Sequence, residues 1–195
     1  MIYFGLVLLL LLLTALFICL HHLYRFPNRT INDVIPFVRR VAVEELESLL
    51  DHRNEETLRQ SLGTSQFAKA QISRIHLFRE KLRCADHNAS IFQDWAAYEI
   101  ERTYVTCDGE VRKSATALLE GCTEFRIAVF WIKFQLNLWY LQLQLFPVRN
   151  IPFVSRLRRV ESFDLLESYR QITRKAAALA AASGEGYKTK LAAAL

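Results

Sequence analysis

The sequence predicts an all-α protein, in which a single N-terminal transmembrane helix is followed by a helical bundle of about five helices. Three observations support this prediction. The 195 residues include only 6 Gly and 4 Pro, and because these residues form most turns, their scarcity indicates few, long elements. Apolar residues recur at helical spacing along most of the chain. An almost uninterrupted apolar run precedes the first charged side chain, Arg25.

The opening apolar run has the length and composition of a membrane anchor. Residues 2–20 contain only Gly5 and Thr14 outside the apolar set. As a helix they would extend about 28 Å, close to the ~30 Å hydrocarbon core of a bilayer. The basic leader and small-residue cleavage site of a secretory signal peptide are missing. We therefore expect residues 1–24 to form an uncleaved anchor that contacts the lipid bilayer through residues 2–20.

Charge asymmetry predicts how this anchor is oriented. No basic residue precedes the run, whereas four arginines follow it closely: Arg25, Arg29, Arg39 and Arg40. Basic residues that flank a membrane helix tend to stay in the cytoplasm. We therefore expect a single-pass membrane protein with its N-terminus outside and residues 25–182 as a cytoplasmic helical domain.

The first half of that domain is expected to contain three helices. One begins at Asn32 or Asp33 and runs to about Leu49, with Pro36 in its opening turn, where proline is tolerated. A short helix over 58–62 ends at Gly63, which is a common helix stop. The third helix begins near residue 65 and runs past residue 100. Residues 86–88 are polar and could interrupt it.

Residues 103–113 allow two structures. Asp108-Gly109 is the dipeptide that a two-residue β-hairpin turn prefers, and β-branched or aromatic residues flank it. The same glycine could instead mark the junction between two helices. A lone two-stranded hairpin is only marginally stable in water, so the helix junction is favoured.

The segment 125–146 is aromatic and almost long enough to cross a membrane. Four of its polar residues fall on one narrow helical stripe: Arg126, Lys133, Asn137 and Gln144. Gln135 and Gln142 lie nearly opposite, which leaves two apolar faces, as expected of a central helix that is packed on both sides. A lysine at the bilayer centre costs roughly 2.5–3.5 kcal/mol, so a core helix is favoured over a second membrane element.

Proline and glycine mark the limits of the last predicted helix. Pro147 ends the preceding helix, and Pro152 can open one that runs to about Ala182. Residues 183–186 read Ser-Gly-Glu-Gly and break that helix. We therefore expect residues 183–195 to be a flexible C-terminal tail.

Three residues are candidates for a metal site. If 67–104 is one helix, His76, Glu80 and His87 share a stripe on it. Only His76 and Glu80 are close enough to hold one ion, and no HExxH or CxxC spacing supplies further ligands. Charged neighbours on the same stripe favour a solvated face instead. No cofactor is expected, since glycine-rich nucleotide loops and a nucleophile motif are missing from the sequence.

The arginines suggest contact with anionic lipid headgroups. The tetrapeptide Ile-Pro-Phe-Val occurs twice, and arginines follow it each time: Arg39 and Arg40, then Arg156, Arg158 and Arg159. In the opening turn of a helix the dipole disfavours cations, so a nearby anionic surface would explain their placement. Solvated or salt-bridged arginines are the alternative. Nucleic acid is an improbable ligand, because no reader motif accompanies these residues.

The predicted function is non-enzymatic interaction or scaffolding at the cytoplasmic face of a membrane, with an unspecified protein partner. The alternative is a membrane-tethered enzyme or metal-binding protein, with a site assembled from scattered residues such as His76, Glu80 and His87.

Overall fold

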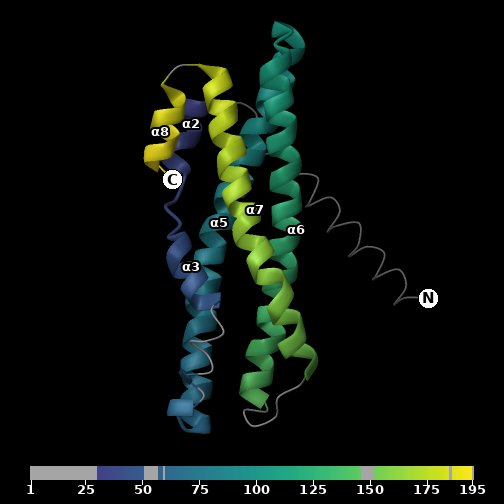
Figure 1. Cartoon of the computed structure of the whole chain (residues 1–195). Helices are drawn as coiled ribbons and strands as arrows, with labels where there is room; N and C mark the ends of the chain where they lie inside the picture. The colour runs from purple at the N-terminus through teal and green to yellow at the C-terminus, as the bar shows by residue number, and fades with distance from the viewer. Residues whose placement is uncertain (1–29, 51–56, 59, 146–151, 185, 195) are drawn as a thin grey trace, which may run out of the picture.

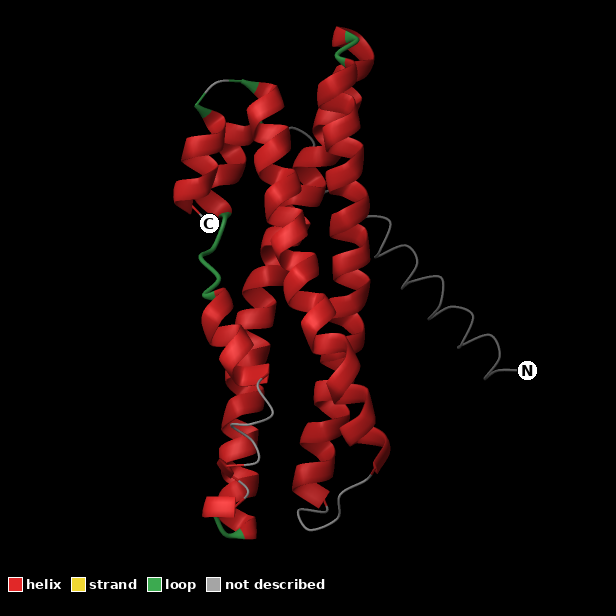
Figure 2. Cartoon of the chain, in the orientation of Figure 1, coloured by secondary structure: helices red, strands yellow, loops and turns green. Residues whose placement is uncertain are grey.

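The computed structural model describes residues 30–50, 57–58, 60–145, 152–184 and 186–194. The predicted all-α class is confirmed, since these residues form helices and no strand (Figure 2). The predicted anchor, residues 1–24, lies outside the described residues. Within the described ranges, no helix is both long and apolar enough to cross a membrane.

Three long helices run side by side and form the body of the molecule (Figure 1). They are α5 (Thr64–Thr106), α6 (Gly109–Leu145) and α7 (Pro152–Ser183), and each reverses the direction of the one before it. The short elements lie on the side of α5 and α7 away from α6; they are α2 (Ile31–Val34), the 3₁₀ helix η1 (Ile35–Phe37), α3 (Val43–Leu50) and α8 (Tyr187–Ala194).

The α5–α6 connection is the predicted helix junction. Thr106 is the last residue of α5, and Cys107 adopts a left-handed conformation with φ 56°, which ends the helix. The Asp108 carboxylate then accepts a hydrogen bond from the Val111 amide at 3.2 Å, which caps the start of α6. Gly109 is the first residue of α6, so the chain reverses at Cys107 and Asp108, before the glycine that suggested the turn.

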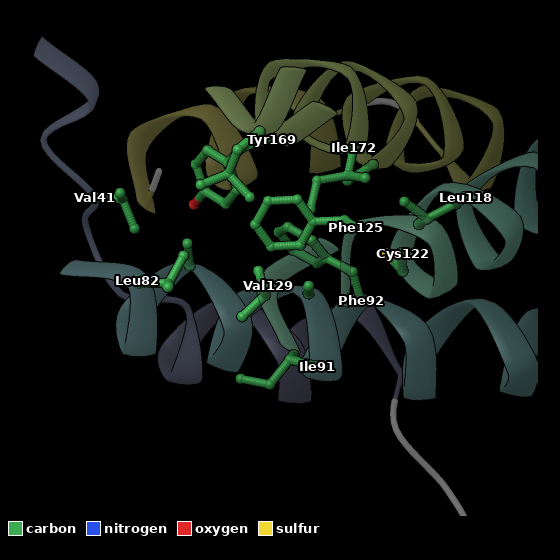
Figure 3. Close-up of a cluster of buried hydrophobic side chains, with 14 of the residues drawn as sticks. Val41, Leu82, Ile91, Phe92, Leu118, Cys122, Phe125, Val129, Tyr169 and Ile172 are labelled. Carbon is green, nitrogen blue, oxygen red and sulfur yellow. The ribbon is translucent and has the colours of Figure 1, made fainter. Parts of the chain in front are cut away.

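The core fills the space between the three long helices (Figure 3). Each helix contributes fully buried apolar side chains: Leu82, Phe92 and Trp95 from α5, Leu118 and Phe125 from α6, and Leu165 and Ile172 from α7. The Phe125 ring packs on the Tyr169 ring with 5.6 Å between centroids. Alanines that are fully buried let the helix axes approach closely, which completes a continuous core.

The predicted first helix is wrong in its extent. Residues 31–37 form α2 and η1, residues 38–42 are extended, and α3 begins only at Val43. The Asp33 carboxylate caps the start by accepting a hydrogen bond from the Thr30 amide at 3.1 Å. Both parts still bury apolar residues, so the helical periodicity read along this segment reflects burial of one side and not a continuous helix.

Asn88 explains why the chain is extended at this point. Its side chain is fully buried, accepts a hydrogen bond from the Arg39 amide at 2.8 Å and donates one to the Arg39 carbonyl at 2.7 Å. It also donates to the Tyr169 hydroxyl on α7 at 2.9 Å. The amide thus satisfies both backbone groups of Arg39, as a neighbouring β-strand would. Helix α5 continues through residues 86–88, where the polar sequence allowed an interruption.

We expect Asn88→Ala to lower the free energy of unfolding by about 2–4 kcal/mol, because it removes the partner of the part-buried Arg39 backbone groups and of the buried Tyr169 hydroxyl. Chemical denaturation of the purified full chain measures the change. Gln171→Ala, at an exposed polar position of α7, serves as the control and should shift stability by less than about 0.5 kcal/mol. Equal stability of the two variants would contradict the role of Asn88.

The C-terminal residues differ from the expected flexible tail. Gly184 and Gly186 have φ values of 149° and 92°, which few other residues adopt, and they turn the chain back on itself. Helix α8 follows and fully buries Leu191 against the core. Arg40 donates a hydrogen bond to the Ala193 carbonyl at 3.4 Å, near the end of α8. The sequence pattern located the break correctly but did not reveal that the last helix folds back.

Limited trypsin digestion tests whether α8 is packed. We expect Lys188 and Lys190 to resist cleavage in the native chain, because a protease needs an unfolded segment in its active site. Leu191→Ala should make both sites accessible and cost about 2–5 kcal/mol, the typical loss for a buried leucine. The matched control is Ala192→Ser, at an exposed position of the same helix, which should leave the digestion pattern unchanged.

Candidate functional site

The predicted metal ligands are not brought together. Helix α5 is continuous, so His76 and His87 are separated by about 16 Å along its axis. His76 is exposed and its ring packs edge-on against Tyr140, while Nε2 of His87 lies 3.2 Å from the Phe37 carbonyl oxygen. Glu80 is exposed. No cluster of three or more metal-ligating side chains occurs in the part of the chain that the structure describes.

The predicted basic patch is placed only in part. Arg39 and Arg40 lie in the extended segment 38–42 and not in the opening turn of a helix, so the dipole argument for them is wrong. The Arg39 backbone contacts Asn88, which also donates a hydrogen bond to Tyr169 on α7. Arg159 precedes Tyr169 by 10 residues, which is about 15 Å along the axis of α7.

The other two arginines of the predicted patch, Arg156 and Arg158, are further still from Tyr169 along the chain. The side chains of Arg156, Arg158 and Arg159 lie outside the described residues. A single lipid-facing patch of all five arginines therefore stays a prediction.

The polar stripe of α6 faces α5 and forms a polar seam between the two helices. Asp86 on α5 pairs with Lys133 at 2.5 Å and lies 3.6 Å from Arg126. Arg126 also donates a hydrogen bond to Gln93 at 2.6 Å. Further along, Arg79 donates to Asn137. The basic residues that argued against a membrane helix thus fix the register of α6 against α5.

One apolar face of α6 is packed as predicted, and the other is not. The side chains of Phe125, Val129, Ile132, Leu136 and Leu143 enter the core. The opposite side of the helix carries six large apolar residues that are exposed, and we call them the α6 stripe: Ile127, Phe130, Trp131, Phe134, Leu141 and Leu145. Among the described residues nothing covers this second face, so the expected packing of α6 on both sides is not found there.

Helical spacing places the six residues of the α6 stripe in a single row. At 100° per residue, all six project within an arc of about 100° over roughly 27 Å of helix. Their exposed fractions run from 48% for Phe134 to 67% for Leu145. The rings of Phe130 and Phe134 both contact the Trp131 ring edge-on, at 6.0 Å and 6.1 Å between centroids.

No family model matches it, and no curated protein or solved structure is significantly similar to it.

The buried ionisable groups among the described residues give no sign of a reactive site. Glu99, at 3% exposure, is the most buried carboxylate among the described residues; it accepts a hydrogen bond from Trp95 Nε1 at 3.2 Å and lies 2.9 Å from Arg102 Nε. Burial raises the pKa of the Cys122 thiol to about 12 and that of the Tyr169 hydroxyl to about 12. A thiol with so high a pKa is a poor nucleophile at neutral pH.

The α6 stripe is the feature of the site that sequence reasoning did not identify. Its residues were recognised as one of two apolar faces, but periodicity alone does not say whether a face meets the core or the exterior. The number of predicted helices gave no signal, because the helix expected from Asn32 or Asp33 to about Leu49 was long enough to cover a second face. The exposed aromatic row makes α6 the candidate functional surface.

The two raised pKa values predict a loss of stability in alkali. Both groups are neutral in the folded chain up to about pH 12, whereas the unfolded chain ionises them above about pH 9–10. The unfolded state therefore binds fewer protons in this window, and the free energy of unfolding should fall by about 1.4 kcal/mol per pH unit for each group. Below about pH 9 the two groups should contribute no pH dependence.

Denaturation of the full chain between pH 7 and pH 11 measures this slope. Cys122→Ala should remove the share that belongs to the thiol and make the decline shallower. Thiol labelling at pH 8 gives an independent check, because exposed Cys107 should react quickly and buried Cys122 slowly. Rapid labelling of Cys122 in the native chain would contradict its buried environment.

Proposed function

We propose that this protein is a membrane-anchored interaction protein, a scaffold at the cytoplasmic face whose docking surface is the α6 stripe. The single observation that carries the proposal is the row of six exposed apolar side chains along one face of α6. Soluble monomers rarely expose contiguous apolar patches above a few hundred Å², and such patches usually mark interaction sites. A scattered set of exposed leucines would carry no such meaning.

The chemistry of the α6 stripe supports association over catalysis. Aromatic residues such as Trp131 and Phe134 are the side chains enriched at the centres of protein interfaces. The stripe contains no titratable group, and two of the charged residues beside it on α6, Arg126 and Lys133, are paired with Asp86. The alternative of an enzyme or metal site built on His76, Glu80 and His87 has no comparable observation in its favour.

The apolar run of residues 2–20 supports the membrane location. The predicted anchor ends at residue 24, and helix α2 begins at Ile31. An extended chain spans at most about 3.5 Å per residue, which would hold the bundle within roughly 25 Å of the bilayer. Under the predicted orientation the bundle is cytoplasmic. Arg39 is exposed, so its side chain could then reach anionic headgroups.

Membrane fractionation tests the anchor. We expect the full chain to stay in the membrane pellet through high-salt and carbonate washes, and a variant that lacks residues 1–24 to be released, because the anchor supplies most of the buried apolar area in lipid. A reporter fused after Leu195 should behave as cytoplasmic. Retention of the truncated variant in washed membranes would contradict the anchor assignment.

Native electrophoresis of membranes solubilised in mild detergent tests the docking surface. The full chain should migrate as an assembly, and Phe130→Ser/Phe134→Ser should shift it to a smaller size by removing two apolar anchors. The matched control is Val105→Ser, which alters an exposed apolar residue outside the α6 stripe. The metal alternative is tested beside it, since His76→Ala/Glu80→Ala/His87→Ala should migrate like the unmodified chain. Equal mobility of all variants would contradict the proposal.

A further inference from the structure

The N-terminal segment joins the bundle on the side opposite the α6 stripe. Helix α2 packs on α5, and α8 packs on α7 and on η1. These short elements lie on the side of α5 and α7 away from α6 (Figure 1). The predicted anchor ends at residue 24, and the connection from there to residue 30 spans at most about 21 Å. A bundle resting on α6 would hold α2 about 20 Å above the bilayer, two helix layers away, and would require this connection to be almost fully stretched.

Exposed basic side chains lie on the same side as α2. Four of them belong to the extended segment 38–42 and to α8, and we call them the α8 patch: Arg39, Arg40, Lys188 and Lys190. The hydrogen bond from Arg40 to the Ala193 carbonyl, at 3.4 Å, joins these two elements. Both lysines lie within five residues of Ala193, about 7.5 Å along α8. None of the four is paired with an acidic residue among those that the structure describes.

Few acidic residues oppose the α8 patch. In α2, η1, segment 38–42 and α8, the acidic residue is Asp33, whose carboxylate bonds to Thr30. The sequence adds Glu185 just before α8, and residues 176–183 at the end of α7 are uncharged. Positive charge therefore prevails at the end of this side that carries α8.

Acidic residues of the neighbouring helices are more distant or paired. On α5, Glu80 and Asp94 each lie about 10 Å along the axis from His87, which contacts the Phe37 carbonyl. That distance is a full Debye length at physiological salt. Helix α3 has three glutamates, of which Glu44 is exposed and the other two form ion pairs: Glu45 with Lys81, and Glu47 with Arg170.

We infer that the α8 patch binds the anionic headgroups of the bilayer that holds the anchor, so that the α6 stripe faces away from lipid. The short connection and the positive charge both favour the side of α2 and α8 as the side toward the membrane. Anionic leaflets attract basic side chains that lie within about a Debye length of the surface. Nucleic acid carries the same phosphate chemistry, but the predicted anchor keeps lipid close to α2 in every molecule. The inference rests on the proposed membrane location and makes the α6 stripe available to a protein partner.

Amine footprinting of the full chain in vesicles tests the lipid contact. An impermeant amine-reactive reagent is applied to vesicles of phosphatidylcholine, with or without phosphatidylserine, and modification is measured by mass spectrometry. Phosphatidylserine should slow the reaction of Lys188 and Lys190 by about threefold or more. Salt at about 1 M should abolish the difference, because the Debye length falls to ~3 Å. Exposed Lys113 lies five whole turns before Trp131 on the same face of α6, and its reactivity should not change.

Charge variants make the footprint specific to the α8 patch. Arg39→Gln keeps both reporter lysines, and the Arg39 guanidinium makes no hydrogen bond within the described residues. This variant should reduce the protection of Lys188 and Lys190 by phosphatidylserine. The matched control is Arg112→Gln, at an exposed position of α6, which should leave the protection unchanged. Circular dichroism should show unchanged helix content for both variants.

Tryptophan fluorescence tests the orientation of α6. Trp95 is buried and Trp139 is half-buried, whereas Trp131 in the α6 stripe is exposed. Trp131→Phe identifies the emission that belongs to the stripe. In phosphatidylserine vesicles a water-soluble quencher should reduce this emission, and a nitroxide-labelled phospholipid should leave it unchanged.

Several results would overturn the inference. Equal reactivity of Lys188 and Lys190 in the two kinds of vesicle would exclude the lipid contact. Slower reaction of Lys113, or quenching of Trp131 by the labelled phospholipid, would place α6 on the bilayer. Protection of the two lysines by added RNA over phosphatidylcholine vesicles, and not by phosphatidylserine, would assign the α8 patch to nucleic acid. The membrane fractionation and the native electrophoresis do not depend on the α8 patch, so failure of the inference is distinguishable from failure of the proposed function.

Discussion

The three hydrogen bonds of the Asn88 side chain join the separate parts of this fold. Asn88 lies at the middle of α5, and its amide fixes the extended backbone at Arg39 and the hydroxyl of Tyr169 on α7. Tyr169 in turn packs on Phe125 of α6. One buried polar group therefore sets the position of the N-terminal segment relative to all three long helices. A buried amide is costly when unpaired, so its satisfied geometry selects this arrangement over looser ones.

Helix α6 combines two opposite requirements in one sequence. Its inner face is apolar and packs in the core, and its seam with α5 is held by Asp86, Lys133 and Arg126. Those two basic residues are directed toward Asp86 on α5, and the outer face carries the exposed apolar row. The same helix therefore links the packing of the bundle to its proposed function.

Particular residues show where reasoning from the sequence succeeded and where it could not. The helix junction near 103–113 and the start of α7 at Pro152 were predicted, because turn residues and proline act locally. The first helix and the tail were mispredicted for the opposite reason. Asn88 lies far along the chain from Arg39, and Leu191 becomes buried only when α8 folds back on the bundle. Of the candidate site residues, His76, Glu80 and His87 shared a helix face as expected, but a shared face is not a shared site.

The sequence by itself determined the helical class, the long elements and the two apolar faces of α6, since periodicity and the scarcity of glycine and proline are properties of the local chain. It also determined the apolar run of residues 2–20. Only the tertiary structure decided which face of α6 is covered. The core holds three long helices, and α5 and α7 occupy one side of α6, so its second face has no neighbour among the described residues. Burial depends on how many elements surround a helix, and no local pattern encodes that number.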